Sequence, residues 1–113
     1  MEVHDVFTLV GEQRRRPEPW REFLRVKALS VGLYKLQAGE ADVQEPHSED
    51  EVYYVLEGRG VVRVGTGEHA VYPGALVYVG AHVEHRFHSI QEELVLLVFF
   101  APAEGSLTSP SRP

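Results

Sequence analysis

The sequence predicts an all-β fold, either a sandwich or a barrel. Short segments rich in Val, Leu, Tyr and Phe alternate with turn residues, and glycines and prolines recur at short intervals between positions 32 and 80. Short strands separated regularly by such residues are typical of sandwiches and barrels. With 113 residues, the chain is long enough for one domain with a single core.

Seven segments are expected to form strands, because each combines apolar alternation with flanking turn residues. Their ranges are 28–36, 52–56, 60–64, 68–72, 76–79, 85–88 and 93–100. Gly65, Thr66 and Gly67 separate the third strand from the fourth, and glycine accepts the positive φ that a tight hairpin turn requires.

The two ends of the chain are expected to lie outside the barrel, which we place at residues 28–100. Residues 1–27 form an N-terminal segment, in which the stretch 17–26 suits either a short helix or an edge strand. Residues 101–113 are rich in Ser and Pro and poor in large apolar side chains. This composition predicts a flexible C-terminal tail.

Composition and charge exclude several classes of function. The net charge is −6, which argues against nucleic acid as a partner, because binding to phosphates needs a clustered basic surface. The longest apolar run, 94–101, is shorter than the roughly 18 residues that span a bilayer, so we expect no membrane segment. The order of charges near the N-terminus does not match a secretory signal, which predicts a cytoplasmic protein. Without cysteine, any metal must be held by histidine and carboxylate.

Histidines and carboxylates gather in two stretches of the sequence. In the first, His47 and Glu51 would lie about 13 Å apart in a straight strand, too far to share one metal ion. The polar run 48–50 favours a bend that brings them together. In the second, strand alternation places His85 on one face and His88 on the opposite face, toward the surface.

The spacing in the first stretch resembles the first motif of the small single-domain cupins. That motif is a glycine, five residues, His-x-His, three or four residues, Glu, six residues and a glycine. Here Gly39 is followed after five residues by Glu45, then by His47, Glu51 and, after six further residues, Gly58. Glu45 therefore stands where the family has its first histidine.

The second stretch resembles the second cupin motif, which is a glycine, five residues, Pro-x-Gly, two residues and His. Gly67 is followed after five residues by Pro73, and Ala75 stands where many cupins have Asp. The closing turn and histidine appear as GAHVEH, residues 80–85. The resemblance covers about residues 28–100 and implies a cupin, or jelly-roll, β-barrel of six to eight strands.

The resemblance also implies one divalent metal ion inside the barrel. Residue by residue, it assigns His47, Glu51 and His85 as ligands and adds Glu45 as a candidate. With two glutamates the ligand set carries −2, which favours Mn, Fe(II) or Zn over Cu. If Glu45 points to solvent, two histidines and one carboxylate remain, a set that suits non-haem iron. Zn, Fe, Mn and Ni stay open.

Three further residues are candidates for the surroundings of the metal or for a substrate pocket. His82 occupies a turn where the family often has glycine, so it either replaces the missing histidine, orients a ligand or lies on the surface. Tyr54 and Tyr34 are candidates to close the pocket, although in a straight strand Tyr54 faces away from Glu51.

Three functions compete at this point. The first is a metal-dependent enzyme that acts on a small molecule by oxygen activation or Lewis-acid isomerisation. The second is a non-catalytic module that binds a sugar or small organic acid, with a structural metal. The third is a metal-free barrel that works through an interface. Similarity to the small cupins also implies a homodimer, and the apolar run 94–100 suits either its interface or the core.

Overall fold

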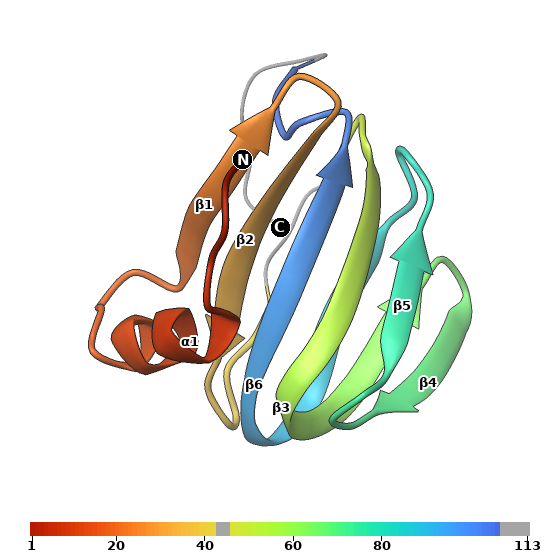
Figure 1. Cartoon of the computed structure of the whole chain (residues 1–113). Coiled ribbons are helices and arrows are strands. Elements are labelled where there is room, and N and C mark those ends of the chain that lie inside the picture. Colours follow the sequence, from red (N-terminus) through yellow and green to blue (C-terminus); the bar gives the residue numbers. More distant parts are fainter. Residues whose placement is uncertain (43–45, 107–113) are drawn as a thin grey trace.

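The computed structural model describes residues 1–42 and 46–106 as an antiparallel β-barrel flanked by a helix (Figure 1). The elements are α1 Val6–Arg14, β1 Trp20–Val26, β2 Leu29–Leu36, β3 Asp50–Val64, β4 Gly67–Val71, β5 Leu76–Val79 and β6 His85–Ala101. The strands form one sheet in the order β1–β2–β6–β3–β4, and β5 pairs with β3. The all-β prediction is confirmed.

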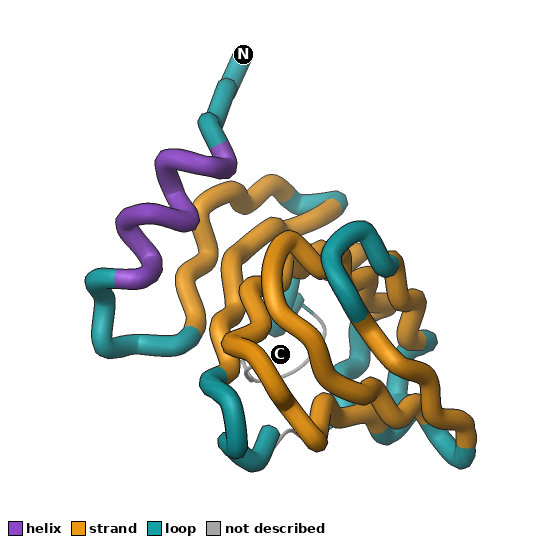
Figure 2. The backbone as a smooth tube through the Cα atoms, turned by 90° about the horizontal axis from the view of Figure 1, so that it is seen from below, coloured by secondary structure: helices purple, strands orange, loops and turns teal. Residues whose placement is uncertain are grey.

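The two long strands, β3 and β6, form most of the barrel. They contain 15 and 17 residues, and each occupies a place where the sequence predicts two shorter strands. Their pairing shifts register three times between Val55 and Val61, so the strands bend without ending. Gly58 lies in this bend with a φ of 94°. The first half of β3 pairs with β5 and the second half with β4, which curls the sheet around an interior (Figure 2).

The interior is filled with aromatic and aliphatic side chains. Tyr53, Phe87 and Phe100 are completely buried, and Trp20 lies so close to Gly32 that a Cβ there would come within 2.3 Å of the indole ring. Four residues of the apolar run 94–100 belong to this core, namely Leu94, Leu96, Val98 and Phe100. Val95 and Leu97 point to the other face of the sheet, as does Phe99, which is 37% exposed.

Helix α1 covers part of the outer face of the sheet (Figure 1). Its Leu9 and Val10 pack with Leu33 of β2 and Val95 of β6. The side chain of Asp5 caps the helix by accepting a hydrogen bond from the main-chain nitrogen of Thr8 at 3.1 Å. This helix was not predicted from the sequence. None of the helices in the described part of the chain is long and apolar enough to cross a bilayer.

Lys35 anchors the C-terminal end of α1 from the neighbouring strand. Its side chain is buried, and Nζ donates hydrogen bonds to the carbonyl oxygens of Gln13, at 2.8 Å, and of Arg16. Carbonyl groups at the end of a helix lack partners within the helix and carry partial negative charge. The ammonium group therefore ties the helix to β2.

The segments 17–26 and 101–106 pack against the barrel. The stretch 17–26 contains β1, which forms an edge of the sheet, one of the two expected alternatives. In the segment expected to be a flexible tail, Ala103 and Glu104 are buried. The main-chain nitrogen of Glu104 donates to Ser30 Oγ at 2.9 Å, which gives that buried hydroxyl a partner. Residues 107–113 lie outside the described residues.

Candidate metal centre

Three side chains singled out in the sequence converge inside the barrel. Glu51 is the second residue of β3, His85 begins β6, and His47 lies just before β3. Glu51 Oε1 lies 3.1 Å from His85 Nε2 and 3.9 Å from His47 Nε2. One ligand atom from each residue lies within 4.8 Å of the other two. These are the three ligand positions that the cupin motifs predict.

The curl of β3 brings Glu51 to His85. His85 pairs with Val64, at the far end of β3 from Glu51. In a straight strand, Glu51 would lie roughly 40 Å from Val64, because each residue advances about 3.3 Å. The three register shifts bend β3 so that its first residues face its last residues across the interior. The site therefore depends on the bend.

A second bend places His47 beside the pair. Ser48 and Glu49 form this bend, and Ser48 Oγ donates to Glu49 Oε2 at 2.6 Å. The main-chain nitrogen of His82 donates to the carbonyl oxygen of His47 at 2.6 Å. The polar run 48–50 thus makes the turn that the sequence predicts, and the loop before β6 holds His47 in place.

The site is closed to solvent and contains unsatisfied polar atoms. The side chains of His47, Glu51 and His85 are each 1% exposed. Both carboxylate oxygens of Glu51 and Nε2 of His85 are buried without a hydrogen-bond partner among the described residues. The 3.1 Å contact between them has the distance of an ion pair but not the geometry of a hydrogen bond. A buried carboxylate in this state is costly unless a cation compensates it.

The orientation of His85 also indicates a cation. Its Nδ1 lies 2.9 Å from the carbonyl oxygen of Val83. Because a carbonyl can only accept, Nδ1 carries the proton, and the neutral ring presents the lone pair of Nε2 to Glu51. Two lone pairs 3.1 Å apart repel each other unless a proton or a metal ion lies between them.

A proton and a metal ion compete for this position. Burial lowers the pKa of His85, but the Glu51 carboxylate, the Val83 carbonyl and the charge of Asp42 act in the opposite direction, and the pKa is raised overall. A metal can bind only the deprotonated ring. Metal affinity should therefore rise as the pH rises through the pKa of His85.

The donor set fits a divalent metal ion. Zinc binds histidine nitrogen and carboxylate oxygen at about 2.0–2.2 Å, so ligand atoms on one ion lie roughly 3.0–3.5 Å apart. Glu51 Oε1 lies 3.1 Å from His85 Nε2 and 3.9 Å from His47 Nε2, so only small side-chain movements would bring these atoms to the distances of ligands on one ion. Two histidines and one carboxylate hold Zn, Fe, Mn or Ni and leave coordination positions open.

Two other predicted site residues, His82 and Tyr54, do not join this cluster. Glu45 lies outside the described residues. His82 is exposed in the turn before β6, with a φ of 65°, and its main-chain bond to His47 is its contribution to the site. Tyr54 is 37% exposed on the outer face of the sheet, as strand alternation from Glu51 requires.

Tyr53, rather than Tyr54, points into the barrel beside the candidate metal centre. It is completely buried, and its ring centre lies 5.9 Å from that of His85. On the other side, Phe100 packs edge-on against His47, with ring centres 5.0 Å apart. The inward orientation of Tyr53 could have been predicted from the sequence. Tyr53 lies two residues after Glu51 in the same strand, so the two side chains point to the same face.

Tyr34 points into the interior, where it donates to a carboxylate that the sequence analysis did not select. Its hydroxyl donates to Asp42 Oδ1 at 2.9 Å, and Asp42 Oδ2 accepts from the main-chain nitrogen of Phe87 at 2.8 Å. Burial, together with the charge of Asp42, raises the pKa of Tyr34, so Tyr34 remains a neutral donor. Asp42 occupies no motif position, and nothing in the sequence marks it.

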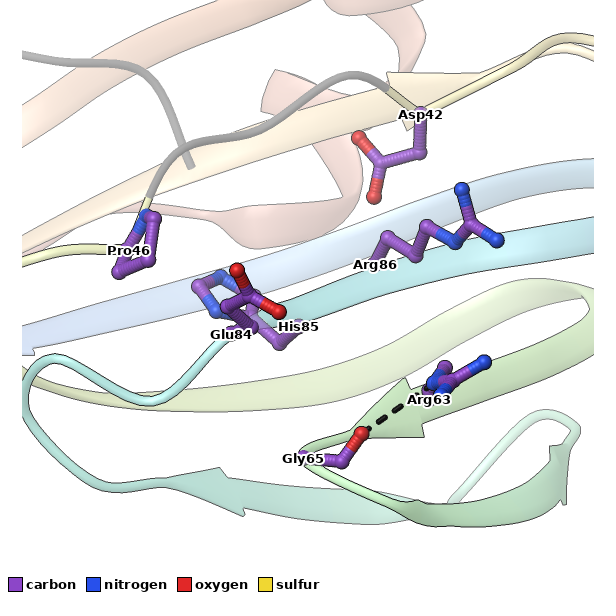
Figure 3. Close-up of a pocket in the computed structure, with 7 residues that line it drawn as sticks. All are labelled: Asp42, Pro46, Arg63, Gly65, Glu84, His85 and Arg86. Carbon is purple, nitrogen blue, oxygen red and sulfur yellow. Dashed lines mark hydrogen bonds between the residues drawn. The ribbon is translucent and has the colours of Figure 1, made fainter.

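A cavity of about 370 Å³ borders His85 (Figure 3). Its lining residues are Asp42, Pro46, Arg63, Gly65, Glu84, His85 and Arg86. Arg63 and Arg86 are paired across β3 and β6, and Arg63 Nε donates to the carbonyl oxygen of Gly65 at 3.2 Å. The volume suits a small molecule. Because the side chain of His85 is 1% exposed, the cavity borders this residue without exposing its ring.

The match to a protein family agrees with this geometry. The sequence model of the cupin domain matches residues 32–100, more than half of the chain. The chain belongs to the cupin family. This cupin is 46% identical over 97 residues to an uncharacterized protein of Streptomyces coelicolor. The aligned region covers 86% of the cupin and 92% of that relative.

Solved structures show the same barrel. The crystal structure of TT1209 from Thermus thermophilus has a TM-score of 0.75 and 33% identity, covering 91% of this cupin and 99% of that chain. The DMSP lyase DddQ from Ruegeria pomeroyi has a TM-score of 0.67 and 19% identity, covering 77% of this cupin and 43% of the lyase. The likeness to the lyase extends to the fold alone.

Proposed function

We propose that this cupin is a metal-dependent enzyme that acts on a small molecule. The observation that carries the proposal is the convergence of His47, Glu51 and His85 within 4.8 Å, with both oxygens of the buried Glu51 carboxylate lacking hydrogen bonds among the described residues. Neutral histidines and one carboxylate are suitable ligands for a divalent ion. The DMSP lyase in the same fold supports the proposal only by showing that such a barrel can house an enzyme.

The residues of the chain have separate parts in this proposal. His47, Glu51 and His85 hold the ion, and the Val83 carbonyl fixes the ring of His85 in the required tautomer. Tyr53 and Phe100 wall the site and keep bulk water from it. A divalent ion held there would polarise a carbonyl or enolate oxygen of the bound molecule, or activate oxygen if it is Fe(II).

Closure of the site favours a second candidate function. The three ligand side chains are each 1% exposed, which suits a structural metal in a non-catalytic module that binds a sugar or small organic acid. The presence or absence of water bound directly to the ion distinguishes the metal-dependent enzyme from the binding module. With Mn²⁺ in the site, water-proton relaxation should reveal exchangeable inner-sphere water if coordination positions are open. Its absence would favour the binding module.

Elemental analysis tests whether a metal site exists. We expect about one divalent metal per chain in protein purified without an affinity tag, and none in the His47→Ala and His85→Ala variants. Each substitution removes one of the three proposed ligands, and the group found among the described residues has only these three members. If the wild type takes up no Fe(II), Mn, Ni or Zn under reducing conditions, the enzyme proposal fails and a metal-free barrel acting through an interface becomes the better explanation.

We further propose that the cupin forms a homodimer through the outer face of its sheet. Tyr54, Leu76, Tyr78 and Phe99 are 37, 66, 60 and 37% exposed, and the strand register places them together on β5, β3 and β6. Helix α1 covers the neighbouring part of this face. An apolar patch of this kind is typical of an interface.

Sedimentation measures the proposed dimer. We expect the wild type to sediment as a dimer and Leu76→Glu as a monomer, because the substitution puts an unpaired charge into the apolar patch. Phe7→Glu is the matched control, since Phe7 is 83% exposed on α1, outside the patch. A wild type that stays monomeric at high concentration, or a Leu76→Glu variant that stays dimeric, contradicts this interface.

A further inference from the structure

Asp42 is a buried carboxylate that connects three parts of the barrel next to the metal centre. It is 5% exposed. Oδ1 accepts from the Tyr34 hydroxyl of β2 at 2.9 Å, and Oδ2 accepts from the main-chain nitrogen of Phe87 in β6 at 2.8 Å. Asp42 itself lies in the segment that leads to His47. One side chain thus ties the segment of His47 to the strand of His85.

The position of Asp42 along β6 places it close to the ligands. Phe87 lies two residues after His85, so both side chains point into the interior, about 6–7 Å apart along the strand. The carboxylate bound to the Phe87 nitrogen is therefore fixed near the ligand ring. Tyr34 is held in turn by an edge-on contact with Trp20, at 6.5 Å between ring centres.

The charges of the described residues also connect Asp42 with a divalent ion. Glu51 contributes −1, and two neutral histidines contribute nothing, so a bound divalent ion would leave a net charge of +1 at the centre. Net charge is costly in a buried, low-dielectric interior. Asp42 lies beside the centre and supplies a further negative charge that offsets this excess.

We propose that Asp42 is a positioning residue of the metal centre, which sets the spacing of His47 and His85 and balances the charge of the ion. This inference rests on the proposed metal-binding function. Groups behind the ligands commonly change metal affinity by 10–100-fold. Asp42 has this effect through its two hydrogen bonds and its charge, without binding the ion itself.

Metal titration of Asp42→Asn tests the inference. The substitution keeps the size of the side chain but removes its charge and one of its two acceptor oxygens. We expect Zn²⁺ affinity to fall 10–100-fold and the visible absorption of the Co²⁺-loaded protein to shift, because the ligand geometry changes. Tyr34→Phe removes one hydrogen bond and keeps the charge, so we expect a smaller, measurable loss of affinity.

Lys35→Met is the matched control for a general loss of stability. It removes a buried polar anchor on the helix side of β2, and we expect lower stability with unchanged Zn²⁺ affinity and Co²⁺ spectrum. If Asp42→Asn binds Zn²⁺ with wild-type affinity and its Co²⁺-loaded form has the wild-type absorption spectrum, Asp42 has a purely structural role and the inference is overturned. If Asp42→Asn does not fold, unchanged affinity in Tyr34→Phe overturns it equally. A wild type that binds no metal instead rejects the proposed function, on which this inference depends.

Discussion

Chelation of the metal should lower the melting temperature of the wild-type protein by roughly 10–20 °C and leave Glu51→Gln unaffected. A ligand present at 100 times its Kd stabilises the folded state by about 2.7 kcal/mol. For a small domain, each kcal/mol corresponds to about 4–8 °C. Glu51→Gln removes the charged ligand, so EDTA has nothing to extract. Thermal scans of both proteins, with excess Zn²⁺ and with EDTA, measure the effect.

The metal-free proteins provide the sharper comparison. In EDTA, we expect Glu51→Leu to be more stable than the wild type by about 1–3 kcal/mol, because both oxygens of the buried carboxylate lack hydrogen bonds among the described residues. Urea unfolding at neutral pH measures this difference. If Glu51→Leu is instead the less stable protein, Glu51 and His85 form a stabilising ion pair without metal, and the barrel does not need an ion.

The alternation and spacing of the sequence were sufficient for the fold class and for the convergence of His47, Glu51 and His85. Strand alternation predicted that His85 and Phe87 share one face of the strand and that His88 points to the opposite face. There, His88 Nε2 lies 3.0 Å from Glu68 Oε1. The polar run before Glu51 predicted the bend that brings in His47. These features depend on neighbours in the chain, and local sequence carries that information.

Other features depend on tertiary contacts that the sequence does not display. Helix α1 contains Val, Thr and Gly, which are weak helix formers, and its stability comes from Leu33, Val95 and Lys35 on distant strands. Asp42 owes its position beside the candidate site to hydrogen bonds with Tyr34 and Phe87, which lie 8 and 45 residues away in the sequence. The sequence predicted that Gly58 lies between two separate strands, 52–56 and 60–64, yet it lies within one continuous strand, because the sheet bends there without breaking.

Gly58→Ala should be the most destabilising small substitution in the barrel, at about 2–5 kcal/mol. Gly58 has a φ of 94°, and a Cβ would lie 2.1 Å from the carbonyl oxygen of Glu93 and 2.7 Å from the Cα of Leu94. The left-handed conformation costs an alanine about 1–2 kcal/mol, and overpacking adds about 1–3 kcal/mol. The clashing atoms belong to the backbone of β6, which cannot move away alone because Leu94 is buried and paired with Leu36 of β2.

Gly74→Ala distinguishes the cost of the left-handed backbone conformation from the cost of overpacking. Gly74 has a φ of 95°, almost the same as Gly58, but a Cβ there meets nothing within 4 Å. We expect this variant to lose only the conformational part, about 1–2 kcal/mol, in urea unfolding. Equal losses in the two variants would show that the contact between β3 and β6 is not tight at the bend. A larger loss in Gly58→Ala, with weakened Zn²⁺ binding, would show that the same close contact curls β3 and brings Glu51 to His85.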